Sequence, residues 1–241
     1  MVVTSAPRQA HRAAGQVHLS AGVVRTELDR LGMHHVADVQ ATEHRMLEAL
    51  AAGERTAFAA AAAERLLRGH EARPPKERRA YPCAWRAMLD AVWSGLAGDP
   101  GAFREVSRLI AEFYLSPYHH DNGADGPDDA TDDAVAATLY AAQCHLHGCV
   151  DFAMWSAACG YDAAAAVASA DLSWSHRRPA ELDPHTWQLA HPALQAELER
   201  QLEDLELLAE QGGMLAADAQ ADRAAAVERL RAQPVGSSMV R

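Results

Sequence analysis

The stretch AFAAAAAERLL, residues 57–67, decides the fold class. It is mostly alanine, which has the highest helix propensity of all residues and a side chain small enough for helices to pack closely. A second alanine-rich stretch, YDAAAAVASA, covers residues 161–170, whereas aromatic residues, which favour strands, make up only 6% of the chain. The sequence therefore predicts an all-α protein.

The rest of the chain fits one helical domain. Its 241 residues, 49% of them hydrophobic, are enough for one sizeable core. Residues 1–16 and 233–241 are polar, without periodicity, and are predicted to be flexible tails. We therefore expect a single domain over residues 17–232, built as a bundle of seven to nine helices around one buried central helix at about 132–159.

Glycine and proline residues divide the domain into its expected helices. The predicted helices cover residues 20–32, 33–52, 54–69, 83–98, 100–115, 132–159, 162–174 and 193–211. Residues 175–192 form a proline-punctuated connector with little regular structure. The last helix carries an apolar seam edged by glutamates, formed by Leu194, Leu198, Leu202 and Leu205. We expect this seam to pack within the chain, with a homodimer as the alternative.

The net charge indicates which partners the protein could bind, and the cysteines and the N-terminal residues indicate where it is located. The net charge of −11 argues against binding nucleic acid or an anionic membrane surface, because both require a positive footprint. It suits an amine-bearing ligand or a basic protein partner. The four cysteines have no disulfide-framework spacing, and the N-terminal residues lack a signal-peptide pattern. We therefore expect a soluble, cytoplasmic protein with reduced thiols.

The stretch CHLHGCVDFAMW, residues 144–155, carries the strongest functional signal. On one continuous helix, His147 and Asp151 lie one turn apart and can form a hydrogen-bonded acid/base pair. Tyr140, Cys144 and Trp155 fall on the same face, which predicts a polar line inside the bundle. The alternative interpretation is a satisfied core pair that only fixes the packing of the helix.

Other polar groups could join this site. Glu112 interrupts an apolar run and could supply a second carboxylate, although a solvated position is the simpler interpretation. His35 and Asp38 are candidate substrate-binding residues near the start of the second predicted helix. Trp174 and His176 are further candidates, because aromatic residues and histidines at connectors often line pockets. Ordinary packing of the connector is the alternative.

No metal or cofactor is predicted. Histidines and carboxylates occur at residues 35–44, but the Glu-x-x-His pairs of di-iron bundles and a His-x-x-x-His pair are absent. The acidic residues between 121 and 132 match a calcium loop only in part, because Gly123 occupies a ligand position and the bidentate glutamate is missing. Phosphate-binding, dinucleotide-binding and Gly-x-Ser-x-Gly motifs are also absent.

These features lead to three functional hypotheses. The first is a cofactor-independent enzyme that performs elimination, isomerisation or ring closure on a polar, amine-containing small molecule. In that enzyme Asp151 orients His147 or acts as the base, and Tyr140 or Glu112 supplies the complementary proton. An alanine- and arginine-rich chain is typical of a high-GC genome, where such a role would fit bacterial specialised metabolism. The second hypothesis is an acidic interaction protein of the immunity or pathway-accessory type, and the third is a metalloenzyme with a histidine and carboxylate site.

Overall fold

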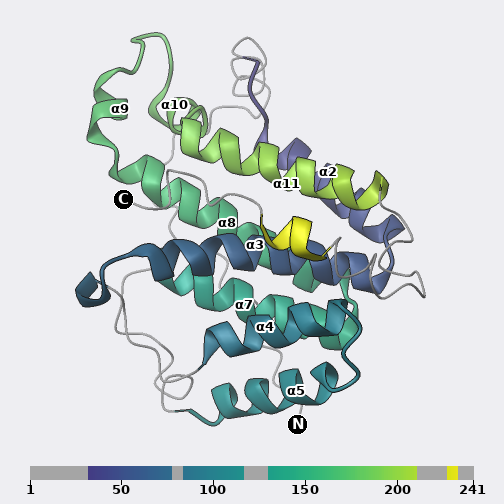
Figure 1. The fold of residues 1–241 in the computed structure, drawn as a ribbon. Helices are drawn as coiled ribbons and strands as arrows, with labels where there is room; N and C mark the ends of the chain where they lie inside the picture. The colour runs from purple at the N-terminus through teal and green to yellow at the C-terminus, as the bar shows by residue number, and fades with distance from the viewer. Residues whose placement is uncertain (1–31, 78–83, 117–129, 211–226, 233–241) are drawn as a thin grey trace.

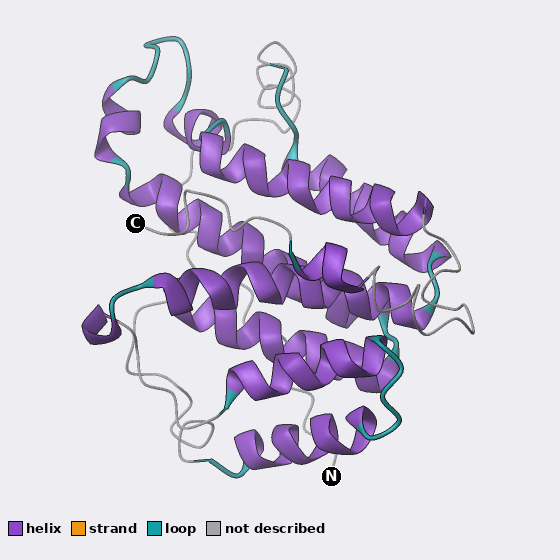
Figure 2. Ribbon diagram, viewed as in Figure 1, coloured by secondary structure: helices purple, strands orange, loops and turns teal. Residues whose placement is uncertain are grey.

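Every regular element in the described part of the chain is a helix, which confirms the all-α prediction (Figure 2). The computed structural model describes residues 32–77, 84–116, 130–210 and 227–232. Both predicted tails, the first predicted helix and most of the acidic loop lie outside these ranges.

The described helices are α2 (Val36–Ala49), α3 (Ala52–Ala72), a 3-10 helix (Pro75–Glu77), α4 (Trp85–Leu96), α5 (Ala102–Tyr114), α7 (Ala130–His147), α8 (Val150–Ala170), α9 (Leu172–His176), α10 (Pro184–Leu189) and α11 (Pro192–Glu210), with a further helical turn at 227–231. From α2 to α5, and again at α11, the α-helices correspond to predicted ones, whereas the residues predicted as two helices, 132–159 and 162–174, form three. The connector is more regular than expected, because α10 forms inside it. Asp183 caps this helix by accepting hydrogen bonds from the backbone N–H groups of His185 and Thr186.

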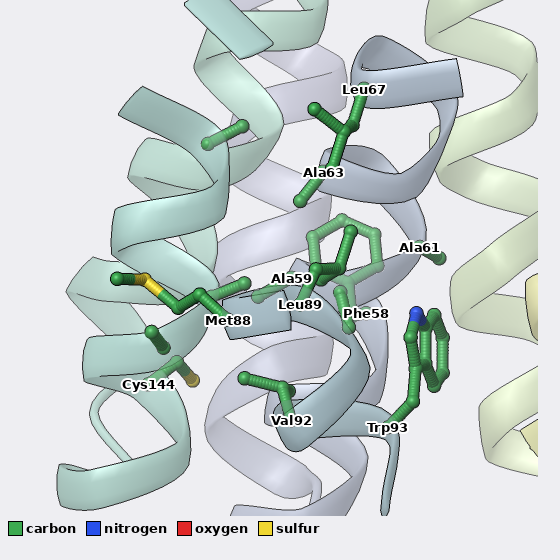
Figure 3. Close-up of a cluster of buried hydrophobic side chains, with 14 of the residues drawn as sticks. Phe58, Ala59, Ala61, Ala63, Leu67, Met88, Leu89, Val92, Trp93 and Cys144 are labelled. Carbon is green, nitrogen blue, oxygen red and sulfur yellow. The ribbon is translucent and has the colours of Figure 1, made fainter. Parts of the chain in front are cut away.

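Helix α3 lies in the middle of the bundle. It contacts α4, α7, α8 and α11, and every residue from Thr56 to Leu67 is buried. In Figure 1, α2 and α11 lie on one side of α3, and α4 and α5 lie on the other. Its alanines let the neighbouring helices approach closely, while Phe58 and Leu67 fill the larger gaps (Figure 3).

The prediction of one continuous helix over residues 132–159 is wrong. The chain forms α7 and α8 instead, and the break lies at Gly148, whose φ of +63° belongs to the left-handed region that favours glycine. The Gly148 N–H donates to the carbonyl of Cys144 at 2.7 Å, which ends α7. A β-carbon at Gly148 would lie 2.7 Å from the β-carbon of Ala52, so α3 leaves room only for glycine.

The guanidinium of Arg55 joins this break to the end of α2. It donates to the carbonyls of Leu47 at 2.7 Å, Glu48 at 3.0 Å and Gly148 at 3.0 Å. The last carbonyls of a helix have no partner within the helix, so a donor from outside stabilises them. Arg55 therefore joins the end of α2 to the break after α7, and it lies 93 residues from Gly148 in the sequence.

A buried ionic cluster joins α3 to α11. The Arg65 guanidinium donates to Asp204 at 2.6 Å and to Glu197 at 3.2 Å, and all three side chains are at most 2% exposed. Gln201 donates to Glu197 at 3.0 Å and to the carbonyl of Ala157 in α8 at 2.9 Å. The buried face of α11 is thus partly polar, in addition to the predicted leucines, of which Leu194, Leu198 and Leu205 are buried and Leu202 is half-buried.

Glu43 places a further carboxyl group beside this cluster. It lies on the inner face of α2, is 1% exposed, and its Oε1 has no hydrogen-bond partner among the described residues. Burial and the nearby charge of Glu197 raise the pKa of Glu43 to about 7. The packing of α2 against α8 and α11 therefore encloses a carboxyl group that changes charge near neutral pH.

Candidate functional site

The break at Gly148 separates the predicted acid/base pair. His147 ends α7 and Asp151 lies in the first turn of α8, so the two side chains are not one turn apart on a single helix. Both are exposed, whereas the prediction placed them on a polar line inside the bundle. Asp151 accepts a hydrogen bond from the Cys149 thiol, with 3.7 Å between sulfur and oxygen. The roles assigned to His147 and Asp151 stay predictions, but the geometry behind them is wrong.

A chain of rings runs across the two helices instead. The ring of Tyr140 in α7 lies 5.5 Å from Trp155 in α8, Trp155 lies 5.3 Å from Phe152, and Phe152 lies 5.7 Å from His147, measured between centroids. Tyr140, Phe152 and Trp155 are half-buried and His147 is exposed. We call these four residues the aromatic face. Burial raises the pKa of Tyr140, so its hydroxyl is protonated at neutral pH.

Carboxylates flank the aromatic face. Asp151 and Asp162 are exposed, and they share one side of α8 with Trp155, because spacings of four and seven residues return to the same side of a helix. On the α7 side, the amide of Gln143 donates to the Tyr114 hydroxyl at 2.7 Å, which connects α7 to α5. The arrangement can bind a cation in two ways, through the ring faces and through the carboxylates.

Cys144 lies in the core and does not reach the aromatic face. Its side chain is fully buried beside Met88 and Ala59 of the core cluster (Figure 3). Its thiol donates to the carbonyl of Cys149 at 3.5 Å and accepts from the Thr56 hydroxyl at 3.8 Å. Burial raises the pKa of Cys144 to about 11, and a buried, protonated thiol is a poor nucleophile. The predicted position of Cys144 on a polar face is therefore wrong.

The structure does not place Glu112, His35 or Asp38 at the aromatic face. Glu112 is exposed on α5, where it pairs with Arg108. His35 and Asp38 are half-buried at the start of α2, and the neighbouring His34 hydrogen-bonds to Gln195 near the start of α11. The other end of α2 is the one that Arg55 joins to the α7–α8 break. A helix of 14 residues is about 20 Å long, which separates the two regions.

Trp174 lines a cavity, whereas His176 is exposed at the end of α9, and the substrate-binding role of both residues stays a prediction. The Trp174 ring stacks on Trp187 of α10, with centroids 4.1 Å apart and planes 4° from parallel. The Trp174 ring also makes an edge-to-face contact with the ring of His191, with 5.1 Å between the centroids. His191 in turn lies 3.4 Å from Asp171, which is a histidine and carboxylate pair that the sequence analysis did not identify.

His191 and Asp171 each accept a hydrogen bond from a backbone N–H group at the start of a helix. His191 is buried, and its Nδ1 accepts the N–H of Ala193 at the start of α11, so its Nε2 carries the proton that faces Asp171. Asp171 also accepts the backbone N–H of Trp174. The pair thus joins the starts of α9 and α11. Its two residues are twenty positions apart, so no helical periodicity in the sequence predicts their contact.

A metal site is not found among the residues that the structure describes. In those ranges no three histidine, cysteine, aspartate or glutamate side chains are grouped so that they could hold an ion. The histidines and carboxylates of residues 35–44 do not gather on one side of α2, because Glu43 is buried whereas His44 is exposed.

Searches with family models, against curated proteins and against solved structures find no match to this chain. Within the described ranges, no helix combines the length and the apolar composition that a membrane crossing requires.

Proposed function

We propose that the protein is a non-catalytic interaction protein that binds a basic protein partner through the aromatic face. The observation that carries this proposal is the continuous chain of rings from Tyr140 to His147, which is partly open to solvent and flanked by Asp151 and Asp162. An immunity or pathway-accessory protein is the type that fits.

Ring chemistry supports the proposal. Aromatic side chains are enriched at protein interfaces, and tryptophan and tyrosine are over-represented among the residues whose loss greatly weakens binding. Trp155 is central in the chain of rings, because it contacts both Tyr140 and Phe152. An arginine of the partner could stack on these rings while its guanidinium pairs with Asp151 or Asp162.

The overall charge supports a basic partner. The chain carries a net charge of −11, and α11 adds a row of exposed carboxylates on its outer side, formed by Glu199, Glu203, Glu206 and Glu210. Such a field speeds association with a positively charged protein and weakens as salt is added. The carboxylates of α11 contribute to this attraction at a distance, whereas the aromatic face supplies the contact.

A peptide selection tests the proposal without a known partner. Random dodecapeptides displayed on phage would be selected against the full chain. We expect the binders to be enriched in arginine and lysine. Trp155→Ala should weaken their binding by about thirtyfold, because a central interface aromatic contributes about 2 kcal/mol or more. Phe103→Ala is the matched control, since Phe103 is an exposed aromatic residue of α5 outside the aromatic face.

A second pair of variants covers the case in which Trp155→Ala unfolds the protein. Asp151→Lys with Asp162→Lys reverses two exposed charges beside the rings, and Glu199→Lys with Glu203→Lys reverses two on α11. The first double variant should abolish peptide binding, while the second should weaken it less than tenfold. Binders without basic residues, equal effects of the two double variants, or no binders at all would each contradict the proposal.

A further inference from the structure

A second region of the molecule, at the end of α8, has an arginine but no carboxylate in the lining of a cavity. The cavity has a volume of about 220 Å³ and lies between the end of α8 and the helices α9 and α10. Its lining residues are Ala168, Ser169, Trp174, Ser175, Arg178, Pro184, Trp187 and Gln188. None of them is acidic, although the chain as a whole carries a net charge of −11.

The aromatic wall of this cavity is held in place by the backbone. The indole N–H of Trp174 donates to the carbonyl of Trp187, and the indole N–H of Trp187 donates to the carbonyl of Trp174, each at 2.9 Å. These reciprocal hydrogen bonds fix two rings that are already stacked. A ligand that packs against this wall therefore loses little free energy to ordering of the side chains.

Two arginines lie at or near the cavity. Arg178 lines it, and one terminal nitrogen of its guanidinium donates to the carbonyl of Leu182, which orients the group. The guanidinium carbon of Arg177 lies 5.3 Å from the ring centroid of Trp174. An arginine fork beside an aromatic wall is suited to a carboxylate attached to an apolar ring.

The nearby carboxylates are engaged with the backbone and with polar side chains. Asp171 accepts hydrogen bonds from Ser173 and from the Trp174 N–H, which lower the pKa of Asp171 to about 2. Asp183 accepts from the Thr186 hydroxyl and from two N–H groups of α10. Both acids are therefore turned toward their own helix starts, and neither lines the cavity.

We propose that this cavity binds a small aromatic carboxylate, with its ring against the tryptophan wall and its carboxylate on Arg178. The volume is below the 300 to 1,000 Å³ of typical drug-sized sites, so the ligand is a single ring with one acidic group. Ser175 and Gln188 supply further polar contacts at the rim. Arg178 thus favours an anion in this cavity, where the net charge of the chain had suggested an amine. This site is independent of the proposed protein interface.

The test is a titration with three single-ring probes of different charge: an anion, a neutral amide and a cation. Benzoate, benzamide and benzylamine would be added to the full chain while the indole N–H resonances of Trp174 and Trp187 are followed by NMR. We expect benzoate to shift both resonances, benzamide to bind about tenfold more weakly, and benzylamine to cause no shift at these residues, since a charge-assisted hydrogen bond is about twice as strong as a neutral one.

Variants separate the arginine contact from a change of fold. Arg178→Gln should weaken benzoate binding about tenfold and bring it to the level of benzamide, because the charge is lost. Arg104→Gln, which removes an exposed arginine from α5, is the matched control and should leave binding unchanged. Equal binding of all three probes, equal effects of the two variants, or no shift with millimolar benzoate in the unmodified chain would overturn the proposal.

Discussion

Replacing Glu43 by glutamine should make the stability of the protein less dependent on pH. The pKa of Glu43 rises from an ordinary value of 4.5 to about 7 in the folded chain, because α2 buries it beside Glu197. A carboxyl group with a raised pKa binds its proton more tightly in the folded state than in the unfolded state. Its contribution therefore favours folding at low pH and is lost as the pH rises from 4.5 to about 7.

The magnitude follows from these two pKa values. One pH unit corresponds to about 1.4 kcal/mol, so the interval from 4.5 to about 7 corresponds to about 3 kcal/mol. Glu43→Gln keeps the shape of the side chain but cannot ionise. At pH 5 the variant and the unmodified protein should unfold at similar urea concentrations. At pH 8 the variant should be more stable by up to about 3 kcal/mol, because its buried group stays neutral.

Urea unfolding followed by circular dichroism at several pH values measures this difference. Comparing the two proteins at each pH cancels the titration of all other groups. Glu206→Gln is the control, since Glu206 is exposed on α11 and should show no such trend. A stability difference that is the same at pH 5 and pH 8, or a Glu43→Gln protein that is less stable at pH 8, would refute the reasoning.

Three further outcomes are expected. Gly148→Ala should lower the free energy of unfolding by about 2 kcal/mol, because alanine is strained at a φ of +63° and its β-carbon would press on Ala52; unchanged urea unfolding would contradict this. Arg65→Leu should cost about 3–5 kcal/mol, since it removes the buried cation that pairs with Asp204 and Glu197 of α11; a thermal scan that shows no loss would exclude this role. Iodoacetamide should modify half-buried Cys149 before buried Cys144, as seen by peptide mass spectrometry, and equal rates would show that the core is open.

The helical class was predictable because alanine content acts locally. The stretch from Ala57 to Leu67 favours a helix by itself, and its small side chains also suit the central position that it takes. The end of α7 was not predictable in this way. A glycine inside an apolar helical pattern is tolerated, and what excludes a side chain at Gly148 is Ala52, which belongs to another helix. That contact exists only in the folded protein.

In the candidate site, too, local features were predictable from the sequence whereas contacts between helices were not. Tyr140 and Trp155 were predicted to share a face of one helix, and they do contact each other, but from two helices that pack side by side. The predicted pairing of His147 and Asp151 depended on an unbroken helix, and the two residues instead lie in α7 and α8, on either side of the break. The stacked Trp174 and Trp187 are 13 residues apart, in α9 and α10, and no periodic pattern indicates their contact, because it arises from the hydrogen bonds that each ring makes to the other's backbone.

The guanidinium of Arg55 has a consequence for the kinetics of unfolding. Its hydrogen bond to Gly148 spans 93 residues of the chain, and its hydrogen bond to Leu47 joins the same guanidinium to the end of α2. Loop closure of this length is costly before the flanking helices are packed, so the contact forms late on the folding pathway. Loss of a late contact speeds unfolding and leaves the folding rate almost unchanged. Arg55 should therefore slow unfolding more than it speeds folding.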